Sequence, residues 1–215
     1  MIKAIIFDLD GLLVDTERLY DAVDHILAAE FGKTVDHKII AQMMSQKPLD
    51  AVTIFRDSLE LDISPAELLQ KRDLILLEKF KTDLLPMPGL FEVITPLHDN
   101  YRLAIATGAP QRFVKVILDY FNLWNFFEVI QASDDISHGK PDPEIYLKTI
   151  KKLNLIPHDC AVLEDSSNGA LAAKRAGCYT VAIPTIYTKQ QDFSFADYLA
   201  ADLIAAKEHI LTISD

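Results

Sequence analysis

Five short apolar runs constrain the fold of this 215-residue chain more than any other feature of its sequence. The runs are residues 3–9, 102–107, 126–132, 160–165 and 179–184. All but the third are nearly continuous in apolar residues, where a half-exposed strand would alternate. Continuous runs of this length favour strands that are buried on both faces, as in a parallel sheet covered by helices.

Segments with helical spacing of their apolar residues lie between these runs. They are residues 111–121, 143–154 and 168–177. Alternating strands and helices are typical of βαβ units with right-handed crossovers. We therefore expect an α/β fold, with a Rossmann-like parallel sheet and helices on both faces. Pro96 falls inside the helix expected over residues 89–99 and should kink or shorten it.

Residues 16–85 interrupt this alternation. They carry apolar residues at helical spacing and show no strand pattern. Ser64, Pro65 and Glu67 form a capping box at the start of one of the expected helices, with the proline where it is tolerated. The sequence therefore predicts a helical insert directly after the first strand.

The insert divides the chain into two expected domains. The catalytic α/β core would comprise residues 1–15 and 86–215, and a helical cap would comprise residues 16–85. Linkers near residues 14–16 and 84–89 flank the cap and would let it move as a lid on a hinge.

Charge and composition exclude several classes of partner. The net charge of −11 argues against nucleic acid and against an anionic membrane surface. A small anionic substrate stays possible if a bound cation reverses the charge locally. Cys160 and Cys178 are expected to be buried free thiols of a reducing compartment. No apolar stretch is long enough for a membrane span or a signal peptide, so we expect a cytoplasmic protein, monomeric by default.

Polar residues follow the first four runs, at the point where each strand would end. They are Asp8, Asp10 and Gly11 after the first run, Thr107, Gly108 and Ala109 after the second, Lys140 after the third, and Glu164 and Asp165 after the fourth. Ligands of parallel α/β sheets bind at the carboxyl ends of the strands. Carboxylates crowded there repel one another, and Mg²⁺ would remove the conflict while binding phosphate oxygens.

The remaining groups at these strand ends suit a phosphoryl group. Lys140 supplies a positive charge, and Thr107 with the backbone N–H groups after it can donate hydrogen bonds to phosphate oxygens. One of Asp8 and Asp10 can attack phosphorus, and the other can move protons to and from the reacting oxygens. A regular strand would point these two side chains the same way, and Gly11 would allow a tight turn beside them.

These motifs resemble those of the haloacid dehalogenase superfamily of phosphotransferases in both order and spacing. The matching stretches are DLDG (8–11), ATG (106–108), GKPDP (139–143) and LEDS (163–166). The insert after the first motif resembles the family's α-helical cap. Leu12 departs from the Thr or Val that the family often has after the glycine.

The resemblance implies a role for each matched residue. Asp8 would be the nucleophile and Asp10 the acid–base, with Thr107 and Lys140 also in the catalytic set. Metal contacts would come from the side chains of Asp8 and Asp165 and from the backbone carbonyl of Asp10, with Glu164 at or next to the ion. The phosphate-binding residues would be Thr107, Gly108, Ala109 and Lys140.

Hydrolysis has three rivals among proteins with such motifs. A true dehalogenase releases halide, which needs no proton, so Asp10 would have no role there. A phosphomutase acting on β-glucose phosphate resembles this chain in core and cap, but such mutases carry a His in the first cap helix where this chain has Tyr20. The third rival is a catalytically inactive metal- or phosphate-binding protein. We favour a Mg²⁺-dependent phosphomonoesterase that works through an aspartyl phosphate.

The substrate is expected to be a small phosphorylated metabolite. The stretch FDLDGLLVDTERLY (7–20) resembles phosphatases acting on pseudouridine 5′-phosphate and related sugar or nucleoside monophosphates. In this cap type, specificity comes from the first cap helix and from the turn before the third. The candidate specificity residues are therefore Glu17, Tyr20, Gln46 and Lys47.

Other acidic residues near the site receive structural interpretations. Asp134 and Asp135 should cap or solvate a loop. Asp142 and Pro143 should start the next helix, and Asp15 should hold the hinge.

Overall fold

The structure is a computed structural model that describes residues 1–43 and 47–214. Its internal contacts divide the chain into two compact units. One unit comprises Met1–Asp15 and Leu85–Asp215, and the other comprises Thr16–Leu84.

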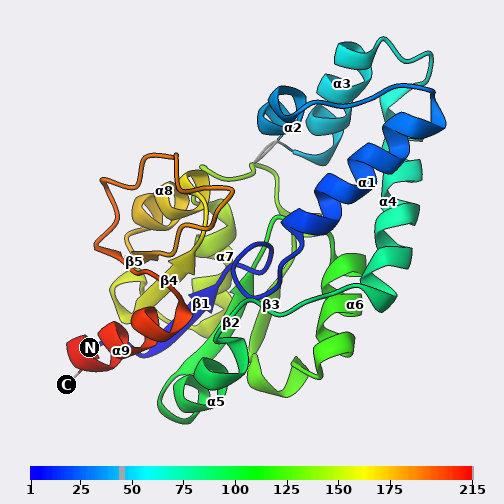
Figure 1. Ribbon diagram of the computed structural model, residues 1–215. Helices are drawn as coiled ribbons and strands as arrows, with labels where there is room; N and C mark the ends of the chain where they lie inside the picture. The colour runs from blue at the N-terminus through cyan, green and yellow to red at the C-terminus, as the bar shows by residue number, and fades with distance from the viewer. Residues whose placement is uncertain (44–46, 215) are drawn as a thin grey trace. The chain divides into compact units, whose positions relative to one another are not determined.

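The first unit is built on a parallel sheet with the strand order β3-β2-β1-β4-β5-β6 (Figure 1). The strands are β1 (Ala4–Phe7), β2 (Arg102–Ala106), β3 (Val129–Gln131), β4 (Cys160–Glu164), β5 (Tyr179–Ala182) and β6 (Tyr198–Leu199). The predicted parallel α/β fold is confirmed. β6 was not predicted, because two residues are too short to show an apolar pattern. β3 begins later than the apolar run, whose first residue, Phe126, still belongs to a 3₁₀ turn.

Helices cover both faces of this sheet. They are α5 (Leu90–Asn100), α6 (Gln111–Phe121), α7 (Glu144–Leu153), α8 (Ser167–Ala176) and α9 (Leu203–Ser214), with 3₁₀ turns η1 (Trp124–Phe126), η2 (Ser133–Asp135) and η3 (Pro157–Asp159). α7 and α8 pack together against β2, β3, β4 and β5, while α5 packs against β2 and α9. Asp134, which was expected to cap or solvate a loop, accepts a 2.6 Å hydrogen bond from the backbone N–H of Gln111, the first residue of α6.

The expectation that Pro96 shortens its helix is wrong. α5 continues through Pro96 to Asn100. A proline removes the hydrogen bond to the carbonyl four residues earlier, here that of Glu92. Glu92 is exposed, so water can satisfy that carbonyl, and the buried face of the helix is left intact.

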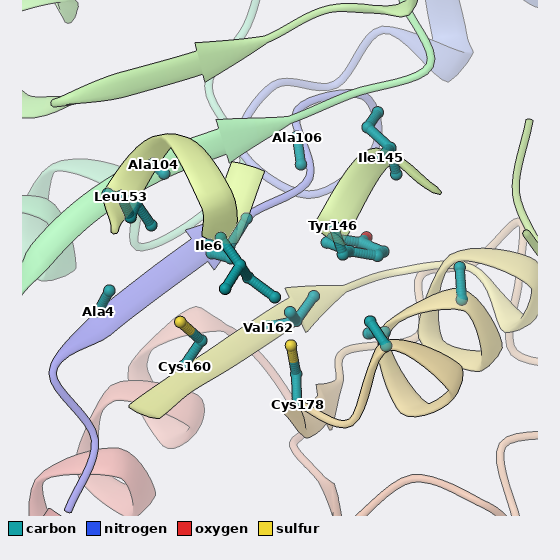
Figure 2. Packing of buried hydrophobic residues seen from close by; sticks show 14 residues of the cluster. Ala4, Ile6, Ala104, Ala106, Ile145, Tyr146, Leu153, Cys160, Val162 and Cys178 are labelled. Carbon is teal, nitrogen blue, oxygen red and sulfur yellow. The ribbon is translucent and has the colours of Figure 1, made fainter. Parts of the chain in front are cut away.

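The core of the sheet face beneath α7 and α8 is mainly aliphatic, with one large aromatic ring (Figure 2). Ala4 and Ile6 of β1 contribute to it together with Tyr146 of α7. Both cysteines, Cys160 and Cys178, lie in this cluster as buried free thiols, as predicted. Because side chains alternate along a strand, every second residue of β1 and β4 points to this face.

The segments that lead into and out of the helical unit are hydrogen-bonded to each other. Val14 forms an antiparallel bridge with Pro86. The backbone N–H of Asp15 donates to the carbonyl of Leu85 at 3.0 Å, and that of Met87 donates to the carbonyl of Leu13 at 2.9 Å. These pairings tie the two segments to each other.

The helical unit has its own apolar core. Its helices are α1 (Glu17–Glu30), α2 (His37–Met43), α3 (Pro48–Leu59) and α4 (Pro65–Thr82). The predicted capping box is confirmed, because Ser64 and Glu67 each accept a hydrogen bond from the other's backbone N–H. α2 was not predicted, since a helix of two turns shows little periodicity. Among the described residues, none of the helices is both long and apolar enough to cross a membrane.

A buried ion pair joins α1 to α4 within this unit. Arg72 donates to both oxygens of Asp24, at 2.7 and 2.8 Å. The guanidinium also lies 5.1 Å from the centre of the Tyr20 ring. Burial raises the pKa of Asp24, although Arg72 opposes that shift. The two hydrogen bonds from Arg72 thus stabilise a carboxylate whose burial is itself unfavourable.

Replacing Arg72 with methionine should lower the free energy of unfolding by about 3–5 kcal/mol, because it leaves the Asp24 carboxylate buried without its cation. Urea unfolding followed by circular dichroism measures the loss. The matched control is Lys71→Met, which breaks the exposed Lys71–Glu30 pair. That change should cost less than about 1 kcal/mol. Equal losses of unfolding free energy in the two variants would contradict a stabilising role for the Asp24–Arg72 pair.

Candidate active site

The sheet brings the predicted polar residues to one edge. β1 lies between β2 and β4, so the residues that end these three strands are neighbours. Phe7 pairs with Leu163, and the backbone N–H of Asp8 donates to the Leu163 carbonyl at 3.1 Å. Alternation places Asp8 and Glu164 on the sheet face that α7 and α8 cover.

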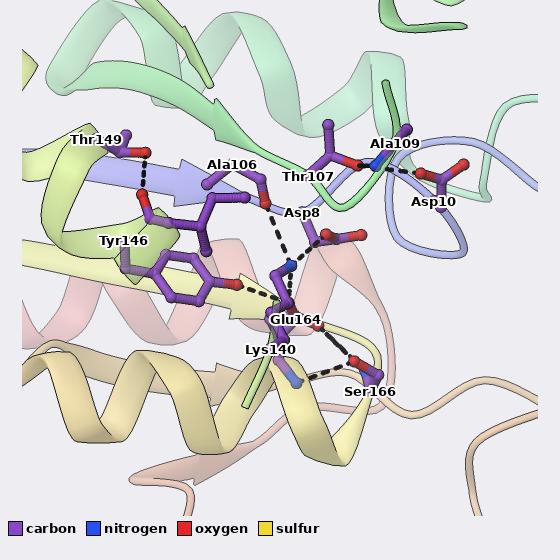
Figure 3. Close-up of polar contacts among 12 residues, drawn as sticks. Asp8, Asp10, Ala106, Thr107, Ala109, Lys140, Tyr146, Thr149, Glu164 and Ser166 are labelled. Atoms are coloured by element: carbon purple, nitrogen blue, oxygen red, sulfur yellow. Dashed lines mark hydrogen bonds and ion pairs between the residues drawn. The ribbon is translucent and has the colours of Figure 1, made fainter. Parts of the chain in front are cut away.

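Lys140 joins the two carboxylates at this edge (Figure 3). Its Nζ lies 2.5 Å from Oδ1 of Asp8 and 2.5 Å from Oε1 of Glu164, and it donates to the carbonyl of Ala106 at 3.2 Å. Only 14% of the Lys140 side chain is exposed. One ammonium group therefore bridges the ends of three strands.

The loop that carries Lys140 is fixed by the start of α7. The carboxylate of Glu144 accepts hydrogen bonds from the backbone N–H groups of Ser137 and His138, at 3.0 and 2.7 Å. Asp142 accepts from the backbone N–H of Glu144 at 2.9 Å, in line with its predicted place before the helix. Hydrogen bonds thus fix the backbone both before and after Lys140.

Thr107 lies at the end of β2 and is fully buried. Its hydroxyl donates to Oδ2 of Asp10 at 3.0 Å and accepts from the backbone N–H of Ala109 at 3.0 Å. Gly108 has open space where a Cβ would stand. The predicted phosphate-binding stretch is therefore linked to Asp10, and Asp8 is linked to Lys140.

Asp8 contacts Lys140 and Asp10 contacts Thr107, because the regular pairing of the strand does not extend as far as Asp10. β1 stops at Phe7, and Gly11 has a φ of +75° in the turn that follows. Two-residue alternation therefore does not orient Asp10, contrary to the expectation from a regular strand. The turn instead directs Asp10 toward the end of β2.

Glu164 is fully buried, and both of its oxygens accept hydrogen bonds. Oε1 accepts from Lys140 at 2.5 Å and from the hydroxyl of Tyr146 at 2.6 Å. Oε2 accepts from the backbone N–H and the hydroxyl of Ser166, at 3.2 and 3.0 Å. Gly169 makes room for this carboxylate, because a Cβ there would lie 1.8 Å from Oε1.

The donor atoms at this edge suit a hard divalent cation. Asp8, Glu164 and Asp165 each offer a carboxylate oxygen, and these atoms lie within 4.8 Å of one another. Gly11 gives Asp165 its place, since a Cβ at Gly11 would lie 2.5 Å from Oδ2 of Asp165. Oxygen ligands of this kind are those that Mg²⁺ and Ca²⁺ prefer.

The electrostatics of the edge also favour added positive charge. Burial raises the pKa of Asp8 to about 8, helped by the carboxylates of Glu164 and Asp10 and opposed by Lys140. Burial alone would lower the pKa of Lys140, but Asp8 and Glu164 hold it well above its usual range. Lys140 therefore stays protonated, and a second positive charge nearby would favour the ionised form of Asp8.

The predicted specificity residues belong to the helical unit. Glu17 begins α1, and the Tyr20 ring meets Phe80 edge-on at 6.4 Å. Lys47 is exposed just before α3. Gln46 lies outside the described residues. The role of these residues in substrate selection stays a prediction.

Tyr146 is the polar contact of the site that sequence reasoning missed. The helical pattern placed it on the apolar face of α7, where it is indeed buried. Its hydroxyl, however, reaches Glu164. The only signal was a hydroxyl-bearing ring on a helix face that is otherwise aliphatic.

The chain matches the family model described as haloacid dehalogenase-like hydrolase over residues 5–183. A phosphorylated carbohydrates phosphatase from Thermotoga maritima is 35% identical over 177 residues, covering 81% of this chain and 82% of that protein. A probable pseudouridine-5′-phosphatase from Drosophila melanogaster is 30% identical, covering 92% of this chain and 88% of that protein.

Solved structures show the same architecture. CbbY from Rhodobacter sphaeroides, in complex with phosphate, superposes with a TM-score of 0.85 at 27% identity and covers 94% of this chain and 95% of that one. A putative β-phosphoglucomutase from Thermotoga maritima has a TM-score of 0.77 at 30% identity, with coverages of 99% and 98%. These matches confirm the resemblance that the four motifs carry.

Proposed function

The chain belongs to the haloacid dehalogenase-like hydrolase family, and we propose that it hydrolyses small phosphorylated metabolites through an aspartyl phosphate formed on Asp8. Several of its curated relatives are named as phosphatases. The observation that carries the proposal is the 2.5 Å contact between Lys140 and Asp8, at the sheet edge where Asp10 is held by Thr107.

The proposed reaction has two steps. In the first, a carboxylate oxygen of Asp8 attacks phosphorus, the bond to the substrate oxygen breaks, and Asp10 gives that oxygen a proton. In the second, Asp10 takes a proton from water, whose oxygen attacks phosphorus and releases phosphate from Asp8. The hydrogen bond from Thr107 to Oδ2 of Asp10 supports this role, because it orients the carboxylate that moves the proton.

The phosphoryl oxygens would be bound by Lys140 and by the backbone N–H groups of Gly108 and Ala109. Lys140 is already fixed beside Asp8, so its charge needs no rearrangement during the reaction. The open space at Gly108 supports close approach of a phosphate to the backbone there. The structure of a relative with bound phosphate is consistent with this proposal.

A Mg²⁺ ion is the proposed cofactor. The side chains of Asp8 and Asp165 and the backbone carbonyl of Asp10 would hold it, with Glu164 next to it. The bound ion would supply positive charge that keeps Asp8 ionised and stabilises the transferred group. The donor set supports this assignment, since it consists of carboxylate oxygens crowded at one edge.

The helical unit is proposed as a substrate-selecting cap over residues 16–85, with Glu17, Tyr20, Gln46 and Lys47 as its specificity residues. The proposed partner is a small phosphorylated metabolite. The net charge of −11 argues against nucleic acid. A monomeric state and a cytoplasmic location stay predictions.

A panel of phosphorylated metabolites assayed for released phosphate should identify the substrate class. We expect turnover of at least one sugar phosphate or nucleoside monophosphate, because relatives named for both kinds of substrate cover most of the chain. β-Glucose 1-phosphate belongs in the panel as the test of the mutase alternative. Its conversion to an isomer without phosphate release would favour a mutase, and no turnover of any compound would favour an inactive binding protein.

A further inference from the structure

Lys140, Asp8 and Glu164 form a lysine–carboxylate cluster. Tyr146 contacts this cluster without taking part in the proposed reaction (Figure 3). Its hydroxyl donates to Oε1 of Glu164 at 2.6 Å, the same oxygen that Lys140 contacts at 2.5 Å. Its ring centre lies 5.2 Å from Nζ of Lys140, within cation–π range. We infer that Tyr146 is a positioning residue for Lys140, acting through Glu164, an inference that rests on the proposed function.

The geometry shows how a hydroxyl on α7 can control a lysine on the preceding loop. Lys140 is shared between two carboxylates, and its place depends on how strongly each attracts it. A hydrogen bond from Tyr146 takes up part of the negative charge on Oε1 of Glu164. Without that donor, Oε1 would attract Lys140 more strongly and draw it away from Asp8.

The Glu164 carboxylate has little freedom to turn away from this arrangement. Its other oxygen is held by the backbone N–H and hydroxyl of Ser166. The close approach to Gly169 restricts the carboxylate on the side of α8. Because the Glu164 carboxylate has little freedom to turn, loss of the Tyr146 hydroxyl should chiefly change the position of the Lys140 ammonium group.

Burial alone does not account for the hydroxyl. Tyr146 is fully buried among apolar neighbours, and a phenylalanine ring would fill the same space. A buried hydroxyl needs a partner, and the partner here is Glu164, one of the two carboxylates that hold Lys140. A purely structural role and a positioning role therefore make different predictions for kinetics.

Tyr146→Phe removes the hydroxyl and keeps the ring. Thr149→Val is the matched control, because Thr149 is also fully buried on α7, and its hydroxyl donates to the Ile145 carbonyl at 2.8 Å, away from the site (Figure 3). With p-nitrophenyl phosphate and saturating Mg²⁺, we expect kcat of Tyr146→Phe to fall about 10-fold, with KM changing less than about 2-fold. Thr149→Val should keep kcat within about 2-fold, while both variants lower the Tm by similar amounts.

A kcat for Tyr146→Phe that matches wild type or the Thr149→Val control would overturn the inference. A wild-type protein that hydrolyses no phosphomonoester would instead count against the proposed function. In that case crystal structures of wild type and Tyr146→Phe decide the inference separately. A longer distance between Nζ of Lys140 and Oδ1 of Asp8 in the variant would support it, and an unmoved lysine would overturn it.

Discussion

Asp8→Asn should abolish hydrolysis of p-nitrophenyl phosphate, with a loss in kcat/KM on the order of 10⁴-fold. The amide has nearly the shape of the carboxylate, but it cannot form the bond to phosphorus on which the proposed reaction depends. Phosphate release at saturating Mg²⁺ measures the loss. Far-ultraviolet circular dichroism and the Tm check that the variant is folded.

The matched control for this prediction is Asp134→Asn. Asp134 is an aspartate outside the cluster, and its carboxylate accepts the first backbone hydrogen bond of α6. Asparagine can accept the same bond, so activity should stay within about 2-fold of wild type. Asp8→Asn protein that still turns over substrate at a wild-type rate would exclude Asp8 as the nucleophile.

Removal of divalent cations should produce the second-largest effect. After dialysis against EDTA and then into chelator-free buffer, the rate should fall on the order of 10³-fold, and added Mg²⁺ should restore it. The physical reason is the crowding of Asp8, Glu164 and Asp165, whose charges Lys140 alone does not balance.

Two further measurements separate a metal effect from damage to the protein. EDTA that has been saturated with Mg²⁺ beforehand should leave the rate unchanged. Mg²⁺ should also raise the Tm of the metal-free protein, and Asp165→Asn should weaken that rise. Full activity after dialysis, together with a Tm that Mg²⁺ does not move, would rule out the proposed ion site.

The apolar runs were sufficient to predict the parallel sheet, because strands buried on both faces leave a continuous signature in the sequence. The same reasoning assembled Asp8, Thr107, Lys140 and Glu164, since parallel strands end at a common edge. It failed for β6 and α2, which are too short to show a period. The expected shortening at Pro96 was also wrong, since α5 runs through the proline to Asn100.

The finer structure of the site was harder to predict, for a different reason. Periodicity reports which side of a helix is buried, and it assigned Tyr146 to the core correctly. It carries no information on which buried atom the hydroxyl contacts, because that depends on how α7 is placed along β4. For the same reason, the sequence did not show that both oxygens of Glu164 are already engaged by hydrogen-bond donors.

The contact between Gly169 and Glu164 has a consequence for how this chain can evolve. A methyl group at position 169 would overlap a carboxylate oxygen, so the glycine cannot mutate while the glutamate keeps its place. A shorter aspartate at position 164 would free that space, but it would also withdraw the oxygens from Lys140 and Tyr146. Positions 164 and 169 are thus epistatic: a substitution at one is tolerated only together with a substitution at the other.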